Sequence, residues 1–188
     1  MSLIYRTAFS ILIVLLLMSA SPITPGWSTK ALAQAEKPTG LAIRSGRGLE
    51  QQIEDGFRQR GFEIVRASEW DQSEERDNPT LRKVILDAPY ASIYGHAARI
   101  EFLLLLPDRR ILIEVKRQRT SGSTDEKLPY VYANAELNIE FGHEFFLIMD
   151  GDGWKPGAVK WTRDRASEND NFSVYTPEEF FAWLERLE

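Results

Sequence analysis

The chain has 188 residues, of which 43% are hydrophobic and 27% are charged, and its net charge is -5. These values fit one globular domain with an ordinary core, and no fixed-period repeat indicates a solenoid or an array. The acidic balance argues against tight, nonspecific binding to nucleic acid. The absence of cysteine excludes disulfides, thiol catalysis and a bacterial lipid anchor.

Residues 1–33 resemble a secretory signal peptide. A short basic start precedes the apolar run of residues 8–18, and Ala31-Leu32-Ala33 has the small-x-small pattern of a cleavage site. We therefore expect a secreted or periplasmic protein. The alternative is an uncleaved membrane anchor, because the cleavage site lies well beyond the apolar run. Residues 34–46 are expected to be a polar tether, and residues 47–188 the folded domain.

A helix is predicted over residues 48–60. Leu49, Ile53 and Phe57 recur at steps of four and form an apolar stripe along it, and Gly61 is typical of a helix end. The helix is therefore expected to pack one side against the core of the domain.

Alternating or periodic apolar residues separated by turn signals predict the other elements. In the first half of the domain we expect a strand at 62–66, a charged loop at 68–79, a short strand or helical turn at 84–86 and a turn-rich aromatic segment at 89–95. Two strands at 100–106 and 111–117 follow, and then a helix from 124 or 125 to 138 and a strand at 144–149. The chain ends with a helix at 157–165, a strand at 172–175 and a last helix that is capped by Thr176 and has Pro177 at its first position. This order predicts an α/β fold in which helices flank a central mixed β-sheet.

The two strands at 100–106 and 111–117 are predicted to form a hairpin through a turn at residues 107–110. If Leu106 pairs with Ile111, Glu101 lies opposite Lys116, which carries the opposite charge.

Glu114 and Lys116 share one face of the second strand, because strand side chains alternate between faces. In the register above, Glu101 lies opposite Lys116 and one diagonal step from Glu114, which corresponds to roughly 7–8 Å. One interpretation is a cross-strand ion pair on a solvent-facing sheet. The other is a site for a hard cation such as Mg²⁺, which binds carboxylate oxygens.

Glu114-Val115-Lys116 resembles the (D/E)xK half of the PD-(D/E)xK nuclease superfamily, with Glu101 where an Asp is usual. Gln118, residues 122–130 and residues 88–95 add to the likeness, which covers roughly residues 48–188. The resemblance implies a restriction-endonuclease-like core and a metal-dependent nuclease that hydrolyses DNA.

The resemblance also implies roles for single residues. Glu101, Glu114 and the backbone carbonyl of Val115 would hold Mg²⁺ or Mn²⁺. Lys116 would orient the attacking water and offset charge on the phosphate. Gln118 and Glu50 would support this group, with Glu54 as the second choice on the first helix. The substrate would be DNA, no small-molecule cofactor is implied, and a homodimer is expected by likeness to the family.

Three residues after the hairpin are candidates for phosphate contacts. Lys127 lies near the start of the predicted helix, where a cation opposes the helix dipole and is better placed beside a phosphate. Ser123 precedes that helix, whose N-terminal N–H groups favour anions. Arg119 belongs to a basic rim beside the proposed metal site.

A second functional hypothesis belongs to a different class. The acidic net charge, the Glu at position 101 and the export signal also fit a catalytically inactive nuclease fold that is exported as a binding or structural module. Metal-dependent cleavage distinguishes the two hypotheses.

Overall fold

The structure is a computed structural model, and it describes residues 48–75 and 80–187. The expected signal peptide or anchor (1–33), the expected tether (34–46) and the last residues of the charged loop (76–79) lie outside the described residues. No helix in the described ranges combines the length and the apolar character that a membrane crossing requires.

Six strands form one mixed sheet, and their order in space is their order in the chain. The strands are β1 (Glu63–Arg66), β2 (Lys83–Ala91), β3 (Ala97–Leu105), β4 (Arg110–Arg117), β5 (Glu144–Asp150) and β6 (Phe172–Tyr175). β3 is antiparallel to both of its neighbours, β2 and β4, and the other neighbouring strands are parallel. The predicted mixed sheet is confirmed.

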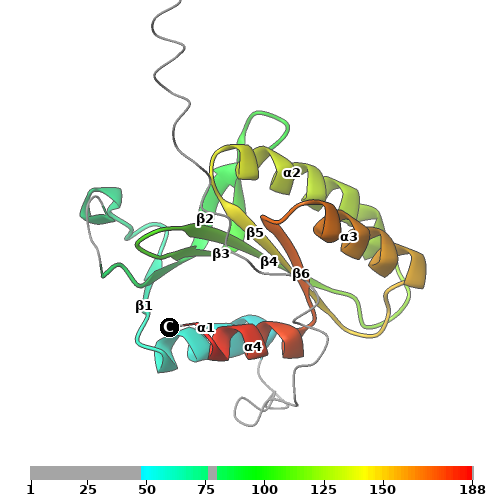
Figure 1. Cartoon of the computed structure of the whole chain (residues 1–188), viewed down its shortest axis with the longest axis horizontal. Coiled ribbons are helices and arrows are strands. Elements are labelled where there is room, and N and C mark those ends of the chain that lie inside the picture. Colours follow the sequence, from blue (N-terminus) through cyan, green and yellow to red (C-terminus); the bar gives the residue numbers. More distant parts are fainter. Residues whose placement is uncertain (1–47, 76–79, 188) are drawn as a thin grey trace, which may run out of the picture. The chain divides into compact units, whose positions relative to one another are not determined.

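Among the described residues, four α-helices cover the sheet. They are α1 (Leu49–Gln59), α2 (Leu128–Glu140), α3 (Pro156–Glu168) and α4 (Pro177–Glu185). Figure 1 shows α1 and α4 against one face of the sheet and α2 and α3 against the other. We call these the α1/α4 face and the α2/α3 face. Each face has its own buried apolar cluster, so the core consists of two layers separated by the sheet.

The predicted ends of the first and last helices are confirmed. α1 ends at Gln59, and Gly61 has a positive φ of 77°, which a residue without a side chain adopts at little cost. α4 begins with Pro177 after a capping box, in which Thr176 Oγ1 accepts the N–H of Glu179 and the Glu179 carboxylate accepts the N–H of Thr176.

Two predictions about the middle of the chain are wrong in the bounds that they gave. β2 has nine residues and runs through Ala91, whereas a short strand or helical turn at 84–86 was expected. The helix expected from residue 124 or 125 is a 3₁₀ turn, Thr124–Lys127, followed by α2 from Leu128. Pro129 occupies the first turn of α2, where its missing N–H is tolerated, and this favours the later start.

Candidate active site

β4 places a glutamate and a lysine on the α2/α3 face. Ile113 and Val115 pack into the apolar cluster of the α1/α4 face, whereas Leu112 packs into that of the α2/α3 face. Because strand side chains alternate, Glu114 and Lys116 belong to the same side of the sheet as Leu112. The predicted shared face of these two charged residues is therefore present in the fold.

The turn before β4 differs from the prediction. Leu105 pairs with Arg110, whereas the predicted register paired Leu106 with Ile111. Leu106 is buried at the start of the loop, and its N–H donates to the carbonyl of Arg109 at 3.0 Å. An apolar residue that resembles the end of a strand is thus part of the turn.

The new register changes the partner of Glu101. It is shifted by two residues, which preserves the face on which each side chain lies. The ladder ends at the pair of Phe102 and Ile113, so Glu101 and Glu114 both lie just beyond it, and the predicted pairing of Glu101 with Lys116 is wrong. The carboxyl groups of Glu101 and Glu114 nevertheless share a hydrogen bond, so they are closer than the predicted diagonal spacing.

The carboxylates and the lysine contact one another and the backbone of β4. Glu101 Oε2 accepts the N–H of Val115 at 3.2 Å. The ammonium group of Lys116 forms an ion pair with Oε1 of Glu114. The ladder between β3 and β4 pairs residues as far as Phe102 and Ile113, and beyond it a side chain satisfies the backbone of β4.

The charges in this cluster are not balanced. Glu114 is only 8% exposed, and this burial raises its pKa to about 8; the charge of Glu101 and a hydrogen bond between the two carboxyl groups act in the same direction. Lys116 lowers the pKa of Glu114 but offsets these effects only in part. Two acids face one ammonium group, so the cluster favours uptake of a proton or a cation.

A change in strand conformation turns the outer half of the β2–β3 hairpin toward α2. Asp87 has a positive φ of 53°, and its carbonyl accepts a hydrogen bond from Arg99 Nη1 at 2.7 Å. Before Asp87 the odd-numbered Ile85 packs on the α2/α3 face, and after it the even-numbered Ala88 and Tyr90 do. Glu101 lies opposite this point in the register.

Three residues of α2 hold the hairpin in place, and none of them was among the residues predicted from the sequence. The Asn138 side chain donates to the carbonyl of Ala91 at 2.8 Å and accepts from its N–H at 3.3 Å. Asn134 Oδ1 accepts the N–H of Ile93 at 2.9 Å. The hydroxyl of Tyr130 lies 3.2 Å from a hairpin hydroxyl, that of Ser92.

A sequence signal for this contact exists. Tyr130, Asn134 and Asn138 recur at steps of four and therefore lie on one side of α2. Both asparagines are almost completely buried. A polar stripe on a helix that also has an apolar side indicates contact with the backbone of another element, because buried amide groups require partners.

Gln118, predicted to support the catalytic group, instead connects two loops at the ends of β4 and β5. Its Nε2 donates to Asp125 and, at 2.9 Å, to the carbonyl of Gly153, and its Oε1 accepts the N–H of Thr124 at 2.8 Å. A Cβ on Gly153 would lie 2.4 Å from the backbone of Thr120, so these loops require a glycine there. Both ends of the Gln118 amide are thus engaged in loop contacts.

Glu50 lies away from the other carboxylates. It belongs to α1, on the opposite face of the sheet from Glu114, and its carboxylate is 4.0 Å from the guanidinium of Arg117. Arg117 also pairs with Asp150. Glu54, the second choice, pairs with Arg58 at 2.9 Å. The structure therefore does not bring either residue of α1 to the pair of Glu101 and Glu114.

The three candidates for phosphate contacts are exposed. Arg119 and Ser123 lie in the loop that Gln118 holds, and Lys127 is the N-cap of α2. The positive charge of Lys127 thus lies at the positive end of a helix dipole, as the sequence predicted. None of the three contacts Glu101 or Glu114.

The donor atoms of the cluster suit a hard divalent cation. Residues 48–75 and 80–187 contain no group of three or more His, Asp or Glu side chains arranged to hold a metal ion. Mg²⁺ is nevertheless commonly held by one or two carboxylates, with waters and substrate oxygens completing its shell. Glu101 and Glu114 supply two carboxylates, and burial together with the charge of Glu101 raises the pKa of Glu114, so a cation here would relieve both effects. Glu101 and Glu114 therefore fit a divalent cation.

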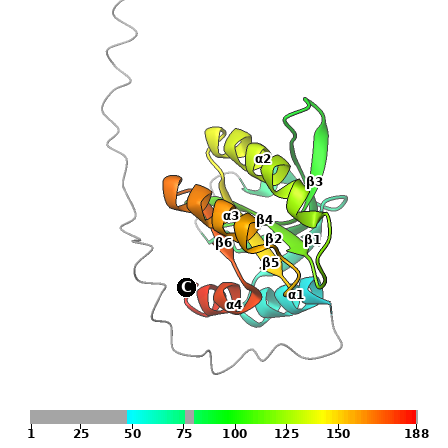
Figure 2. The ribbon, with the colours of Figure 1, turned by 90° about the vertical axis from the view of Figure 1, so that its right-hand side faces the viewer.

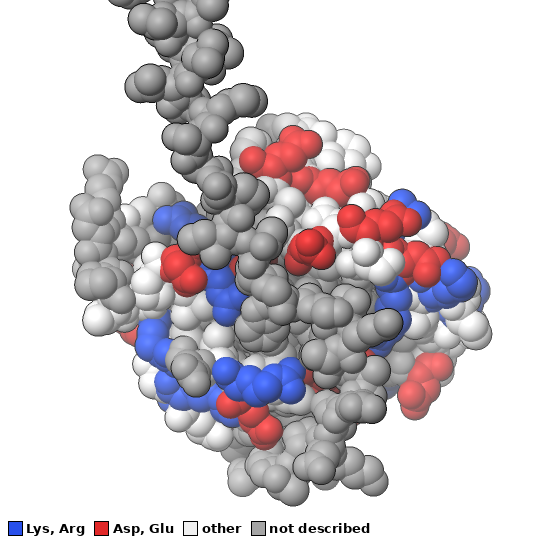
Figure 3. All heavy atoms as spheres, in the orientation of Figure 1, with Lys and Arg blue, Asp and Glu red and all other residues white. Residues whose placement is uncertain are grey.

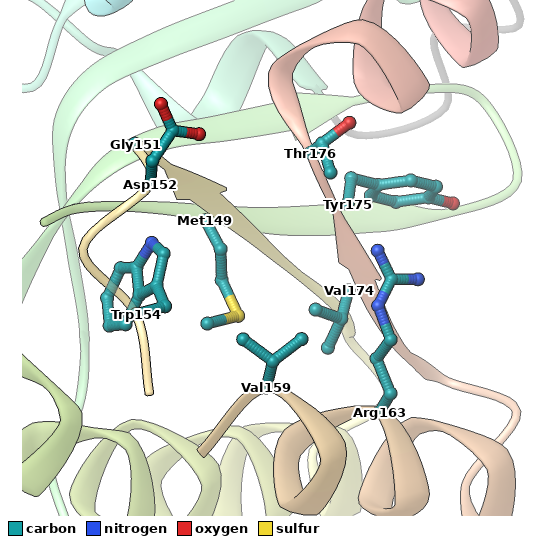
Figure 4. A pocket seen from close by; sticks show the side chains of 9 residues that line it. All are labelled: Met149, Gly151, Asp152, Trp154, Val159, Arg163, Val174, Tyr175 and Thr176. Carbon is teal, nitrogen blue, oxygen red and sulfur yellow. The ribbon is translucent and has the colours of Figure 1, made fainter. Parts of the chain in front are cut away.

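A separate hollow of about 240 Å³ lies among β5, β6 and α3. Figure 4 shows Met149, Val159 and Val174 directed into it, with Trp154 on one side and Arg163 on another. The guanidinium of Arg163 is already paired with Glu179 at 2.9 Å. None of the predicted site residues lines this hollow, so it is distinct from the carboxylate pair.

The surface charge is mixed. In the view of Figure 3, acidic side chains predominate over α2 and α3, and basic side chains predominate toward α1 and β1. No single basic face covers this view, which agrees with the acidic net charge of the chain. Binding to a phosphate backbone would therefore depend on local cations and not on the overall field.

Comparison with known proteins identifies a family. Residues 41–188 match the sequence model described as a PD-(D/E)XK nuclease superfamily domain. The match includes every predicted site residue and extends over most of the chain. No curated protein matches the chain.

Proposed function

Because the chain belongs to the PD-(D/E)XK nuclease superfamily, we propose that it is a metal-dependent nuclease that hydrolyses phosphodiester bonds of DNA. The observation that carries this proposal is that two glutamates converge on one point of β4: Glu101 accepts the N–H of Val115, and Glu114 pairs with Lys116. A buried carboxylate such as Glu114 beside the half-buried Glu101 is costly unless a proton or a cation neutralises the charge. A reaction that requires a cation at this point would explain why the two carboxylates lie together.

Glu101, Glu114 and the backbone carbonyl of Val115 would hold Mg²⁺ or Mn²⁺. Such a cation supplies hydroxide near neutral pH by lowering the pKa of water, and it offsets negative charge on the phosphate. The hydrogen bond from the Val115 N–H fixes the carboxylate of Glu101 against β4. This contact holds the carboxylate of Glu101 in place before the substrate binds, and such preorganisation is how a site for a developing charge lowers a barrier.

Lys116 would act on the phosphate and on the attacking water. Its side chain is 22% exposed, so the ammonium group lies between the buried Glu114 and solvent. From there it can donate to a phosphate oxygen or orient water, and it can offset charge that develops in the transition state. Arg119, Ser123 and Lys127 would contact neighbouring phosphates of the strand.

Gln118 would position those phosphate contacts, and Glu50 has no part in the proposal. The amide of Gln118 holds the loop that contains Arg119 and Ser123, so its effect on the substrate is indirect. Glu50 lies on the other face of the sheet and pairs with Arg117.

The test measures cleavage of supercoiled plasmid DNA by the full chain with Mg²⁺ or Mn²⁺. We expect Glu114→Gln and Lys116→Ala to lower the rate by about 100-fold or more, because each removes a group that acts on the reacting phosphate or water. The matched control is Glu144→Gln, since Glu144 is a half-buried carboxylate on β5 that pairs with Arg109 and lies, like Phe146, on the opposite face of the sheet from Glu114. It should retain wild-type activity.

Calorimetric titration of Mn²⁺ into the same proteins separates binding from chemistry. Wild type and Glu144→Gln should bind, and Glu114→Gln should bind much more weakly. Cleavage that persists in both Glu114→Gln and Lys116→Ala would refute the assignment of these residues. A wild-type chain that neither binds metal nor cuts DNA would support the inactive, exported binding module instead.

A further inference from the structure

The tip of the β2–β3 hairpin exposes a stack of aromatic rings. Tyr94 is 70% exposed, and the neighbouring Ile93 is 43% exposed. The ring of Tyr94 is nearly parallel to that of Tyr130, with centroids 5.4 Å apart and planes at 22°. It is equally parallel to the ring of His96, at 6.1 Å and 21°. We call Tyr94, His96 and Tyr130 the ring stack.

Hydrogen bonds of the backbone and of the Ser92 hydroxyl hold the hairpin tip that carries the ring stack. Ser92 N–H donates to the carbonyl of His96 at 3.1 Å, and Gly95 N–H donates to the carbonyl of Ser92 at 2.9 Å. The Tyr94 N–H donates to the hydroxyl of Ser92 at 3.2 Å, and that hydroxyl lies 3.2 Å from the hydroxyl of Tyr130. Rings fixed in this way lose little entropy when a planar ligand binds, which favours binding.

The ring stack lies along the strand that carries Glu101. Figure 2 shows the β2–β3 hairpin extending beside α2. His96 precedes Glu101 by five residues of nearly continuous strand, a span of roughly 17 Å at about 3.4 Å per residue. One strand of nucleic acid covers this span with about five nucleotides, since its rise is about 3.4 Å per nucleotide.

A cation accompanies the rings. Lys127 is exposed and lies three residues before Tyr130, so it is on the same side of the first turn of α2. Stacking rings beside a positive charge is the arrangement by which proteins hold single-stranded nucleic acid, with bases on the rings and phosphates on the cations. A base inside a duplex is already stacked and cannot reach such a surface.

We propose that the ring stack binds an unpaired base of the strand that is cut, so that the preferred substrate is single-stranded DNA or a duplex with an unpaired end. This inference extends the proposed nuclease function by naming its substrate class. It takes its support from the exposure of Tyr94, the parallel rings and their position on the hairpin of Glu101.

The test measures binding without cleavage. The full chain is mixed in EDTA with a fluorescein-labelled 20-nucleotide single strand, or with the corresponding blunt duplex, and anisotropy is recorded. Tyr94→Ala should weaken binding of the single strand by about 5- to 100-fold, which is the range for the loss of one stacked base. Binding of the duplex should change less than twofold. Phe141→Ala is the matched control, because Phe141 is 64% exposed at the C-terminal end of α2 and should leave both affinities unchanged.

Tyr94→Trp tests stacking directly and guards against a folding defect in the alanine variant. It should bind the single strand at least as tightly as wild type, and binding should quench the fluorescence of the added indole. Unchanged single-strand affinity in Tyr94→Ala, an equal loss for duplex and single strand, or no single-strand binding by wild type would each overturn the inference.

The outcome is independent of the cleavage assay. If cutting depends on Glu114 but Tyr94 has no effect on single-strand binding, the proposed nuclease function is supported and base binding by the ring stack is refuted. If the chain binds single strands selectively through Tyr94 but does not cut them, base binding by the ring stack is supported and the proposed nuclease function is refuted.

Discussion

The two faces of the sheet are built from different kinds of contact. On the α1/α4 face the buried residues are apolar, and aromatic rings from α1, α4, β5 and β6 pack edge to face. On the α2/α3 face the apolar cluster is interrupted by buried polar groups, which include Glu114, Asn134 and Asn138. The first face contributes mainly stability. The second has fewer apolar contacts, and its buried polar groups position a hairpin and a charged cluster.

The apolar face should give the largest effect on stability. Phe180 is completely buried and contacts the rings of Phe57, Tyr175 and Trp183. Phe180→Ala should lower the free energy of unfolding by about 3–5 kcal/mol, because it removes buried apolar area and leaves a cavity. Urea denaturation measures this difference.

The control for Phe180→Ala is Phe141→Ala, which removes an exposed ring and should change the stability by less than about 0.5 kcal/mol. A loss below about 1 kcal/mol in Phe180→Ala would mean that the α1/α4 face is not the main source of stability. The two faces would then differ in composition only.

A polar contact on the other face should have a smaller effect that is confined to the hairpin. Asn138→Ala leaves the N–H and carbonyl of Ala91 without their partners, which should lower the free energy of unfolding by about 1–3 kcal/mol. Amide hydrogen exchange should accelerate from Ala91 to the hairpin tip and remain unchanged in α4. Glu140→Ala, an exposed change on the same helix, is the control. Uniform acceleration in every element would refute a local role for Asn138.

The predictability of each part follows the range of the interactions that determine it. The start of α4 could be predicted because its signals, Thr176, Pro177 and Glu179, are adjacent in the chain. The shared face of Glu114 and Lys116 could be predicted because alternation in a strand is also local. The register was wrong by two residues, since hydrophobicity alone does not show whether Leu106 ends a strand or begins a turn.

The remainder depends on contacts between distant segments. Asp87-Ala88-Pro89 indicates the end of a strand, yet β2 continues because the conformation of Asp87 and the asparagines of α2 redirect it. Glu50 was grouped with the carboxylates by resemblance, but whether α1 packs on the face of Glu114 is decided by the tertiary fold. The proximity of Glu101 and Glu114 could be predicted because a single hairpin contains both residues.

The smallest effect we expect on stability is a gain, and it comes from the charged cluster itself. Glu114→Gln keeps the shape of the side chain and removes its charge. Burial and Glu101 raise the pKa of Glu114 from 4.5 to about 8, so the folded protein takes up a proton that the unfolded chain releases. The contribution of this group is therefore fully present below pH 4.5 and is lost as the pH rises toward 8.

In EDTA at pH 9, Glu114→Gln should accordingly be more stable than wild type by about 1–2 kcal/mol, and at pH 5 the two should be nearly equal. Lys116 is not left as a buried charge, because its side chain is 22% exposed and can turn to solvent. Glu54→Gln, a change on the surface of α1, should alter stability by less than about 0.5 kcal/mol at both pH values. Urea denaturation at the two pH values measures the difference.

A variant less stable than wild type at pH 9 would mean that the ion pair with Lys116 outweighs burial and repulsion, and that Glu114 stabilises the fold. A gain in stability together with the loss of cleavage would mean that the α2/α3 face keeps this carboxylate for its chemistry, at a cost to stability that the apolar face offsets.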